Sequence, residues 1–385
     1  MEHFFVAERS TSPTTALQRW VVADTRTYTL HTETTAFLTG LRNKGRSPNT
    51  ERAYAGRLAL YLNYCHSHHI DWAAPDFMTL SGLQQWLITE PLPPRSTRIR
   101  PTTPRYRTHN TANAVMTAIT DFLGFGSLHG WVPAHTATLL STPRLLRRPV
   151  PGHDTGEHGQ WRHVQAATFR FRVTESGYQD LSRDRIRRMI TTAPRARDRF
   201  LIALLATTGL RIGEALGLHR EDLHLLASSH ALGCPTRGPH IHVHRRTDNP
   251  NRALAKSRRP RTIPVTPELV TLYTDYQHER SRVPEAADNP MVFVNLFRAP
   301  LGRALSYPNT KAAFDRWART ADHPARPHML RHSAATQWLR DGVERDVVQH
   351  LLGHASPLSM DHYRHVTESE TRAAVDRLQT LREQT

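Results

Sequence analysis

The first third of the chain carries apolar residues at the spacing of amphipathic helices. A helical pattern begins near residue 32, and Ser47 followed by Pro48 is typical of a second helix start, because serine caps free N–H groups and proline loses no hydrogen bond there. The pattern predicts two further helices, over 79–89 and about 110–123. The predicted inward faces are Tyr54, Leu58, Tyr61, Leu62 and Cys65; Leu80, Leu83, Trp86 and Leu87; and Ala112, Val115, Ile119, Phe122 and Leu123. We therefore expect a small helical domain here.

The second half of the chain mixes helical patterns with one short stretch of strand alternation. An apolar block over 200–205 predicts a buried helix that Gly209 ends, and a second helix follows over about 212–218. The alternation over 240–244 is typical of a strand, and 261–265 is predicted to pair with it. Helices follow to the end, so the predicted fold class is mainly α with a small β-sheet, an α+β fold.

These patterns divide the chain into four segments. Residues 1–27 are a polar N-terminal extension without a clear period, and 28–132 hold the predicted helical domain. Residues 133–176 are polar with few apolar anchors and are predicted to be a linker, and the second domain occupies 177–385. A long linker allows two lobes to close around an extended partner.

The composition points to a polyanionic partner. The 385 residues carry a formal net charge of +17, which favours a polyanion such as double-stranded DNA. The loop over 91–107 is rich in proline and arginine and has no acidic residue, so it either lies along a phosphate backbone or is a solvated insertion. Only three of the 51 Lys and Arg residues are lysines, which makes Lys256 conspicuous.

Two further features concern location. Cys65 and Cys234 are too few for a disulfide framework, and no stretch approaches the roughly 18 uncharged apolar residues expected of a membrane span. The first residues show no basic segment followed by a long apolar region. We therefore expect a cytoplasmic, nucleoid-associated protein without a membrane partner.

Two arginines are candidates for holding a phosphodiester. In-line attack at phosphorus spreads negative charge over the non-bridging oxygens, and a planar guanidinium can donate hydrogen bonds to two of those oxygens at once. Arg211 follows the predicted helix break at Gly209, and Arg331 lies three residues after His328. We predict that Arg211 and Arg331 form a phosphate clamp.

The remaining groups suit a strand-transfer reaction. Tyr363 is the predicted nucleophile, and a phenol with a pKa near 10 is only about 0.1% ionised at neutral pH, so it needs a base and nearby positive charge. His328 or His354 can take or share its proton, because imidazole titrates close to the working pH. The departing 5′ oxygen needs a proton, and Lys256 is the predicted general acid.

These motifs occur in the order of a known family. Over roughly residues 28–380 the chain resembles the tyrosine recombinase, or phage integrase, family. The matching boxes are Thr208-Gly209-Leu210-Arg211-Ile212-Gly213-Glu214; Lys256 followed by Arg261-Thr262-Ile263-Pro264; His328-Met329-Leu330-Arg331; and Leu352-Gly353-His354, with Tyr363 nine residues after His354. The helix start at Ser47 also looks like the opening of the family's core-binding domain, which assigns DNA binding to 28–132.

The resemblance implies a C-shaped, two-lobed clamp in which a core-binding domain and a catalytic domain hold DNA for site-specific recombination. It implies a 3′-phosphotyrosine intermediate, attack by a free 5′-hydroxyl, and no requirement for a cofactor, ATP or metal. By the same resemblance Glu214 supports the site through a hydrogen bond, and His332 supports the residues that contact the phosphate without contacting it directly. The linker, the loop over 91–107 and the segment 224–239 are longer than the family's compact members need.

The C-terminal end is predicted to be a docking helix. Thr367 and Glu370 form a capping box, and Val375, Leu378 and Leu381 share one face of the helix that follows. The family commonly docks this element on a neighbouring protomer. A homotetramer on two DNA sites is therefore implied, with accessory DNA-bending or directionality factors as further partners.

A histidine-rich strand raises the question of a metal site. His240, His242 and His244 alternate along one strand face, with Cys234 nearby. Three such positions spread over about 13 Å, too far for all of them to meet one ion without a bend. We therefore predict no metal and assign these side chains to a partly exposed sheet face.

Two other functions use part of the same motif set. A non-catalytic regulator could use 327–353 as a helix–turn–helix with Gly342 at its turn. Such a protein would have no use for Tyr363, Lys256 or Arg211. A type IB topoisomerase uses similar groups to relax DNA, but the two-lobed pattern with a terminal helix favours recombination. Integration, excision and transposition of a mobile element share one active site, so these motifs leave that choice open.

Overall fold

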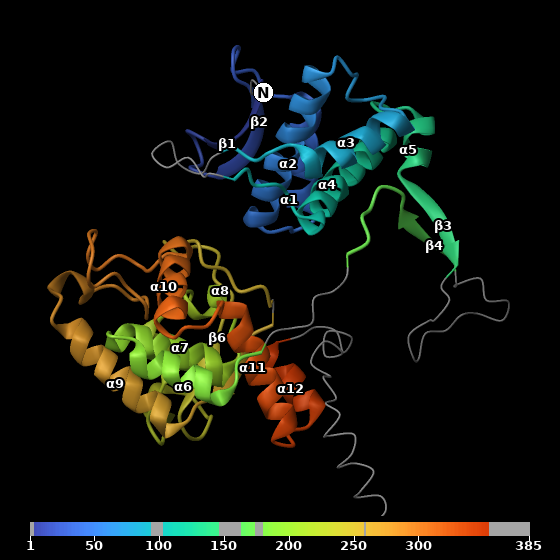
Figure 1. The fold of residues 1–385 in the computed structure, drawn as a ribbon. Coiled ribbons are helices and arrows are strands. Elements are labelled where there is room, and N and C mark those ends of the chain that lie inside the picture. Colours follow the sequence, from blue (N-terminus) through green and yellow to red (C-terminus); the bar gives the residue numbers. More distant parts are fainter. Residues whose placement is uncertain (1–3, 94–102, 146–162, 174–179, 258, 354–385) are drawn as a thin grey trace, which may run out of the picture. The chain divides into compact units, whose positions relative to one another are not determined.

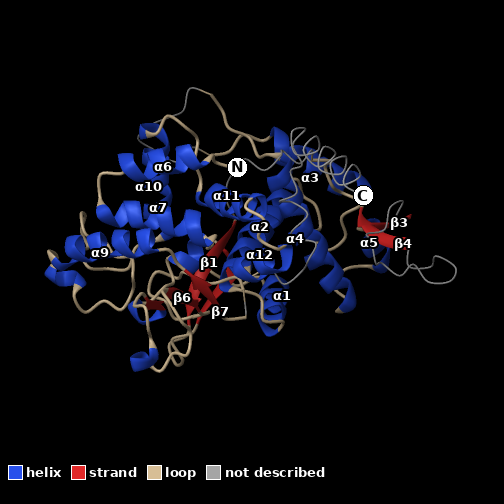
Figure 2. Ribbon diagram, turned by 90° about the horizontal axis from the view of Figure 1, so that it is seen from below, coloured by secondary structure: helices blue, strands red, loops and turns tan. Residues whose placement is uncertain are grey.

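The structure is a computed structural model that describes residues 4–93, 103–145, 163–173, 180–257 and 259–353 (Figure 1). The chain divides into two compact units, Met1–Glu175 and Ser176–Thr385, which are described separately. Helices dominate the described part of both units and the strands are short (Figure 2). The predicted fold class, mainly α with small sheets, is confirmed.

The N-terminal unit begins with a β-hairpin that the sequence pattern did not predict. β1 (Phe5–Thr11) pairs antiparallel with β2 (Gln18–Asp24). The hairpin is held on α2 (Pro48–Ser67) by polar contacts: the Phe5 N–H donates to Asn63 Oδ1 (2.9 Å), Asn63 Nδ2 donates to the Phe5 carbonyl (2.7 Å), and the Trp20 N–H donates to Glu51 Oε1 (2.9 Å). Phe5 and Ala7 on β1 and Trp20 and Val22 on β2 also pack against the helical core. Each strand thus carries only two such alternating positions, within a segment rich in polar residues, and the residue pattern alone did not indicate the strands.

The helices of this unit follow the predicted apolar periods. They are α1 (Thr32–Asn43), α2, α3 (Phe77–Thr89) and α4 (His109–Leu128). The Ser47 side chain accepts a hydrogen bond from the Thr50 N–H, as predicted for an N-cap. Predicted inward residues such as Leu58, Leu80 and Ile119 are fully buried, and each such side chain stabilises the fold by about 1.5–3 kcal/mol.

The segment predicted to be a linker contains regular structure. α5 (Ala134–Leu139) is followed by a hairpin of β3 (Ser141–Leu145) and β4 (His163–Ala167). Beyond it, Phe169 is buried, and the backbone of Phe171 exchanges two hydrogen bonds with the Asn113 side chain on α4. The described part of this segment therefore packs onto the N-terminal unit through a few well-placed anchors.

The second unit consists of helices around a three-stranded antiparallel sheet in the order β5-β6-β7. The strands are β5 (Leu223–His224), β6 (His240–Val243) and β7 (Arg261–Pro264), and the predicted pairing of the last two is confirmed. The helices are α6 (Arg183–Thr192), α7 (Ala196–Thr208), α8 (Ile212–Ala215), α9 (Pro267–Ser281), α10 (Tyr307–Thr320), α11 (Pro327–Arg340) and α12 (Arg345–Leu352), with short 3-10 turns at Arg220–Asp222, His230–Leu232 and Pro284–Ala286. α8 is shorter than the predicted 212–218, because the chain turns at Gly217, whose N–H bonds to the Glu214 carbonyl.

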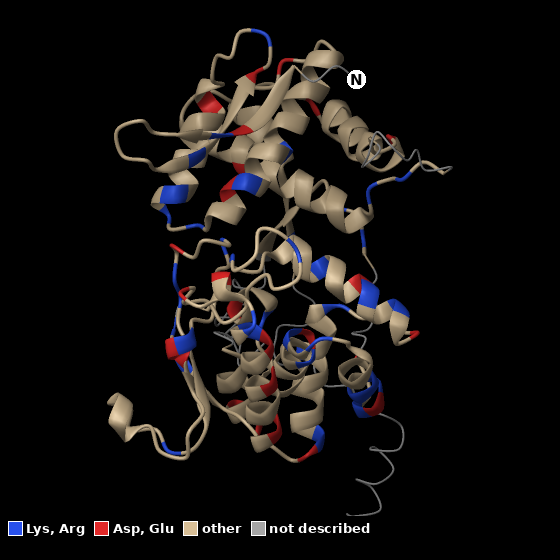
Figure 3. Ribbon diagram, turned by 90° about the vertical axis from the view of Figure 1, so that its left-hand side faces the viewer, with Lys and Arg blue, Asp and Glu red and all other residues tan. Residues whose placement is uncertain are grey.

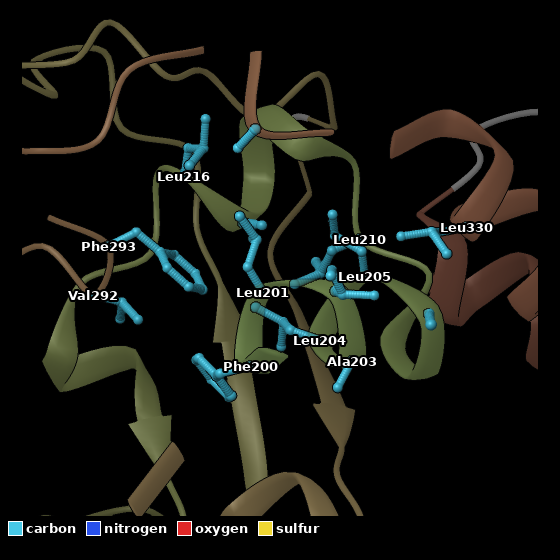
Figure 4. Close-up of a cluster of buried hydrophobic side chains, with 14 of the residues drawn as sticks. Phe200, Leu201, Ala203, Leu204, Leu205, Leu210, Leu216, Val292, Phe293 and Leu330 are labelled. Carbon is cyan, nitrogen blue, oxygen red and sulfur yellow. The ribbon is translucent and has the colours of Figure 1, made fainter. Parts of the chain in front are cut away.

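α7 forms the centre of this unit. Its apolar block is buried between α6, α9 and α11, and side chains such as Phe200, Leu204 and Leu205 pack with Phe293 and Leu330 (Figure 4). The predicted buried helix is confirmed. Such a fully packed helix is a rigid base for the loop that leaves its C-terminal end.

Charge is spread over both units. Lys and Arg residues occur on helices and loops of each unit, interspersed with Asp and Glu (Figure 3). In the described part of the chain, the helices fall short of the length and apolar character needed to cross a bilayer.

Candidate active site

A glycine turn places Arg211 at the start of α8. α7 ends at Gly209, which has a φ of 62°, a conformation that favours glycine. A Cβ at this position would lie 2.8 Å from Leu352 Cδ2 and 3.2 Å from the Trp338 ring. Leu210 is buried beneath the turn, and Arg211 is the N-cap residue of α8, with its side chain 25% exposed. The tight turn therefore fixes where this guanidinium emerges.

Glu214 is the centre of a compact ionic cluster, which we call the Glu214 cluster: Glu214, Arg211, Arg261 and Arg331. Its Oε2 accepts from the Arg211 N–H (3.0 Å) and from Arg261 Nη2 (2.8 Å), and its Oε1 accepts from Arg211 Nη1 (3.1 Å). Arg331 Nη1 lies 4.0 Å from Oε2. Burial would raise the pKa of the Glu214 carboxyl, but Arg261 and Arg211 together lower it below its usual range. One ionised carboxylate thus compensates part of the charge of three arginines, while its part in a reaction stays a prediction.

Arg261 is a member of this cluster that the motif reasoning did not single out. It is 6% exposed, and its Nε donates to the Leu351 carbonyl (2.8 Å). A Cβ at Gly353 would lie 2.8 Å from Arg261 Nη1, so the end of α12 closes directly over the guanidinium. The available signal was strand alternation, since Arg261 shares the buried face of β7 with Ile263.

Arg331 is held more tightly than Arg211. It is 1% exposed, and its Nη1 and Nη2 donate to the carbonyls of Gly209 (2.7 Å) and Leu352 (2.8 Å). These two bonds join α11 to the end of α7 and to the end of α12. Arg331 therefore organises the cluster from within, whereas Arg211 presents its guanidinium to solvent.

His328 lies in the first turn of α11, one turn before Arg331. Its ring centroid is 4.2 Å from that of the buried His332. Partial burial of the imidazole lowers the pKa of His328 below its usual range. The positive charges of Arg331, Arg211 and Lys256 lower that pKa further, which favours the neutral imidazole, the form that accepts a proton.

Lys256 lies in the connection between β6 and β7 and is exposed. The chain just before it passes close to α8, since a Cβ at Gly213 would lie 2.9 Å from the Leu254 carbonyl oxygen. The turn that carries the ammonium group is therefore seated against the helix that carries Arg211. Through-space charge from Lys256 reaches His328.

His354 and Tyr363, the two remaining predicted site residues, lie outside the described residues, as does the predicted terminal helix. The described chain ends at Gly353, which caps α12 with a φ of 64°. Gly353 and its neighbour Leu352 lie against Arg261 and Arg331, so the end of α12 lies directly beside the Glu214 cluster.

A second polar cluster lies on the sheet, and its geometry differs from the predicted one. The side chains of His224, Cys234, His240 and His242, which we call the His–Cys cluster, place one potential ligand atom each within 4.8 Å of one another. Burial and the neighbouring imidazoles lower the pKa of His242 below its usual range. The objection that a straight strand cannot converge on one ion does not hold, because His224 enters from β5 and Cys234 from the β5–β6 connection. His244 lies past the end of β6 and outside this group.

Comparisons with known proteins support the family resemblance. The sequence profile of the phage integrase family matches residues 179–370. Transposase A from transposon Tn554 of Staphylococcus aureus is 28% identical over 337 residues, which cover 87% of this chain and 87% of the transposase. Tyrosine recombinase XerA of Pyrococcus furiosus is 29% identical over 205 residues, 53% of this chain and 63% of XerA.

Solved structures share the fold. The Tn1549 transposon integrase in complex with circular intermediate DNA aligns with a TM-score of 0.55 at 15% identity, over 90% of this chain and 99% of the integrase chain. XerH site-specific recombinase bound to difH substrate aligns with a TM-score of 0.54 at 18% identity, over 89% and 83% of the two chains. At such identities the likeness concerns the fold alone.

The fold and the ordered boxes define an enzyme that cleaves and rejoins DNA. The chain belongs to the phage integrase family of tyrosine recombinases.

Proposed function

We propose that this enzyme recombines DNA at specific sites of a mobile element, with Tyr363 as its nucleophile and the Glu214 cluster as its phosphate-binding part. The observation that carries the proposal is convergence. Arg211 and Arg331 come from separate stretches of sequence and meet at Glu214, with N···O distances of 3.1 and 4.0 Å, and their charges, with that of Lys256, lower the pKa of the His328 imidazole. Such a concentration of cations around a proton acceptor suits an anionic transition state at phosphorus.

Each residue has a proposed role in the cleavage step. The Tyr363 oxygen attacks phosphorus as its proton passes to His328 or His354. The bond from phosphorus to the 5′ oxygen breaks, and Lys256 delivers a proton to that oxygen. The product is a 3′-phosphotyrosine and a free 5′-hydroxyl, and attack by a 5′-hydroxyl of the partner strand reverses the chemistry and rejoins the DNA.

The arginines differ in their proposed contributions. Arg211, partly exposed beside the Lys256 turn, donates directly to the non-bridging oxygens. Arg331 is the second member of the clamp and is enclosed; its Nη1 and Nη2 donate to the carbonyls of Gly209 and Leu352, which fixes its positive charge within the site. Glu214 fixes both guanidiniums and stays ionised throughout, and Arg261 holds the carboxylate in place.

The mobile-element setting is inferred from relatives. Transposase A of Tn554 aligns over most of both chains, and a transposon integrase shares the fold. These matches favour recombination of a mobile element over a topoisomerase or a simple regulator. α11 and α12 do form a helix pair with a turn at Gly342, but the pair contributes Arg331 and covers Arg261, which a pure DNA-binding motif does not require.

A covalent trapping experiment tests the proposed nucleophile. The full-length protein is incubated with a nicked DNA site from which the released strand diffuses away, and the adduct is measured on a denaturing gel. We expect the adduct to form with the wild type and to be absent in Tyr363→Phe. Tyr307→Phe, at an exposed tyrosine in the same unit, should retain it. An undiminished adduct in Tyr363→Phe would overturn the assignment.

We further propose that protomers assemble as a homotetramer on two DNA sites through the C-terminal helix. Accessory DNA-bending or directionality factors are proposed as additional partners, and the nucleoid as the cellular location. Deleting residues 370–385 should leave binding to a single site unchanged while recombination between two sites falls. Full recombination by the truncated protein would contradict docking in trans. Native mass spectrometry of the DNA complex measures the stoichiometry directly.

A further inference from the structure

The His–Cys cluster brings four metal-binding side chains together from three segments of the second unit. His224 lies on β5, Cys234 on the connection between β5 and β6, and His240 and His242 on β6. Cys234 and His240 are buried, and none of the four residues belongs to the Glu214 cluster. One thiol and three imidazoles form a donor set with a strong preference for zinc among the metals common in proteins.

Three of the distances within the cluster match a tetrahedral site, and the four potential ligand atoms all lie within 4.8 Å of one another. Cys234 Sγ lies 3.4 Å from His240 Nε2 and 3.5 Å from His242 Nε2, and the two Nε2 atoms lie 3.1 Å apart. Around a tetrahedral zinc ion, bond lengths near 2.0 and 2.3 Å give about 3.3 Å between two nitrogens and about 3.6 Å between nitrogen and sulfur. The three measured separations agree with these values to within a few tenths of an ångström. The centroid of the His224 ring lies 5.0 Å from that of His240 and 4.6 Å from that of His242.

The outer nitrogens of two rings are held as they are in metal sites. His240 Nδ1 lies 2.7 Å from the Gly238 carbonyl, so Nδ1 carries the proton and Nε2 presents a lone pair to the cluster. His242 Nδ1 lies 3.2 Å from Thr262 Oγ1. A carboxylate, a backbone carbonyl or a water molecule usually supports the far nitrogen of a metal-bound histidine, and the Gly238 carbonyl has that position here. When both Nδ1 atoms donate, two lone pairs face each other at 3.1 Å, an arrangement that a shared cation stabilises.

The imidazole of His224 gives an independent indication of a bound metal ion. Its Nδ1 is buried, and among the described residues it has no hydrogen-bond partner. A buried polar atom left unsatisfied destabilises a fold by about 1–3 kcal/mol, so native structures rarely keep one without a reason. The described protein atoms therefore do not by themselves satisfy this cluster.

We propose that His224, Cys234, His240 and His242 bind one Zn²⁺ ion in a closed, structural site. Four protein ligands leave no open position, so the ion has a structural part and takes no step in the DNA chemistry. It fixes the connection over 225–239 to the sheet. The proposal is independent of the proposed function, since it concerns metal binding by residues outside the Glu214 cluster.

A metal ion at this site would also stiffen the β6–β7 hairpin, whose connection carries Lys256. Thr262 faces His242 across the strand pair, whereas its neighbour Arg261 points to the opposite face and binds Glu214. The ion would therefore clamp one face of the β6–β7 hairpin while the other face holds the ionic cluster. Lys256 lies in the connection between these two strands.

Metal content of the full-length protein tests the proposal. The protein is purified without a polyhistidine tag, dialysed, and analysed by inductively coupled plasma mass spectrometry. We expect one zinc per chain in the wild type. In Cys234→Ser and His240→Asn, zinc affinity should fall by more than about 100-fold, because loss of a ligand exceeds the 10–100-fold effect of losing an outer hydrogen bond. His244→Asn, two residues beyond a ligand on an exposed position, and Cys65→Ser, at the other free cysteine, should keep the full content.

A second measurement replaces zinc by Co²⁺ in the wild-type protein. It keeps the test valid even when a variant fails to fold, because it reads the site in the wild type itself. A thiolate-bound tetrahedral cobalt ion gives intense visible bands with a sulfur-to-metal charge-transfer band, and Cys65→Ser should retain them. Folded wild-type protein that binds zinc no more tightly than Cys234→Ser, or whose cobalt spectrum lacks the thiolate band, would overturn the site. Neither readout depends on DNA cleavage, so failure of the metal site and failure of the recombinase assignment are distinguishable.

Discussion

The Glu214 cluster and the His–Cys cluster contact opposite faces of the β6–β7 hairpin, and their buried polar groups are satisfied in different ways. In the first, an ionised carboxylate is matched by guanidiniums within 2.8–3.1 Å, so the protein compensates the charge internally. In the second, potential ligand atoms of one cysteine and three histidines converge, and the proposed zinc ion would satisfy them from outside the chain. The comparison shows that a buried ionic site is complete when the chain folds, whereas a buried ligand site is complete only with its ion.

The largest effect is expected from removing the carboxylate of the Glu214 cluster. Glu214→Gln leaves the buried Arg261 charge without its counter-ion and should lower the free energy of unfolding by about 3–5 kcal/mol, measured by urea denaturation followed by circular dichroism. Glu221→Gln is the matched control, because its side chain is 74% exposed and its pair with Arg246 is worth at most about 1 kcal/mol. Equal effects of the two substitutions would show that the cluster is not an internally compensated site.

A second large effect concerns cleavage alone. Arg211→Ala removes the partly exposed guanidinium while Glu214 keeps Arg261, so the fold should persist. Covalent adduct formation in a single-turnover assay should fall about 10²–10³-fold, the usual consequence of losing one preorganised donor to an oxyanion. Arg183→Ala, at an exposed surface ion pair, should leave the rate unchanged. A wild-type rate in Arg211→Ala would remove this residue from the phosphate clamp.

The His–Cys cluster should respond weakly when no metal is present. In chelator-treated protein, Cys234→Ser replaces one small neutral group by another and strands no charge, so the free energy of unfolding should change by less than about 1.5 kcal/mol. With zinc added, only the wild type should gain stability, because the ion binds the native state. A metal-free loss as large as that of Glu214→Gln would erase the contrast between the two clusters.

The smallest expected effect is a shift in titration. In the free protein, the His328 imidazole should titrate below 6.5 by NMR, and Lys256→Gln should raise its pKa by removing one of the positive charges that act on it. The pKa of His328 is lower in the folded protein than in the unfolded chain. Its contribution to the free energy of unfolding is therefore fully present above pH 6.5 and is lost as the pH falls from 6.5 towards the pKa of the folded state. A pKa unchanged by the substitution would place Lys256 too far away to act with His328.

Much of the fold was predictable from local patterns. The apolar block of α7 and the Ser47 cap of α2 belong to segments whose structure is decided by neighbouring residues, and both are as predicted. The N-terminal hairpin and the folded part of 133–176 were not predicted, since both depend on contacts with distant elements, such as Asn63 on α2 for the hairpin and Asn113 on α4 for the backbone of Phe171. Sequence periodicity does not record such contacts.

The same division holds for the two clusters. The sequence by itself determined the order of Arg211, Lys256, His328 and Arg331, because the chemistry of phosphate transfer requires particular residue types in recognisable local settings. Only the tertiary structure decided that Arg261 completes the ionic cluster and that His224, not His244, joins Cys234. The first result depends on which face of β7 packs against α8, and the second on the pairing of β5 with β6, and both join positions that are remote along the chain.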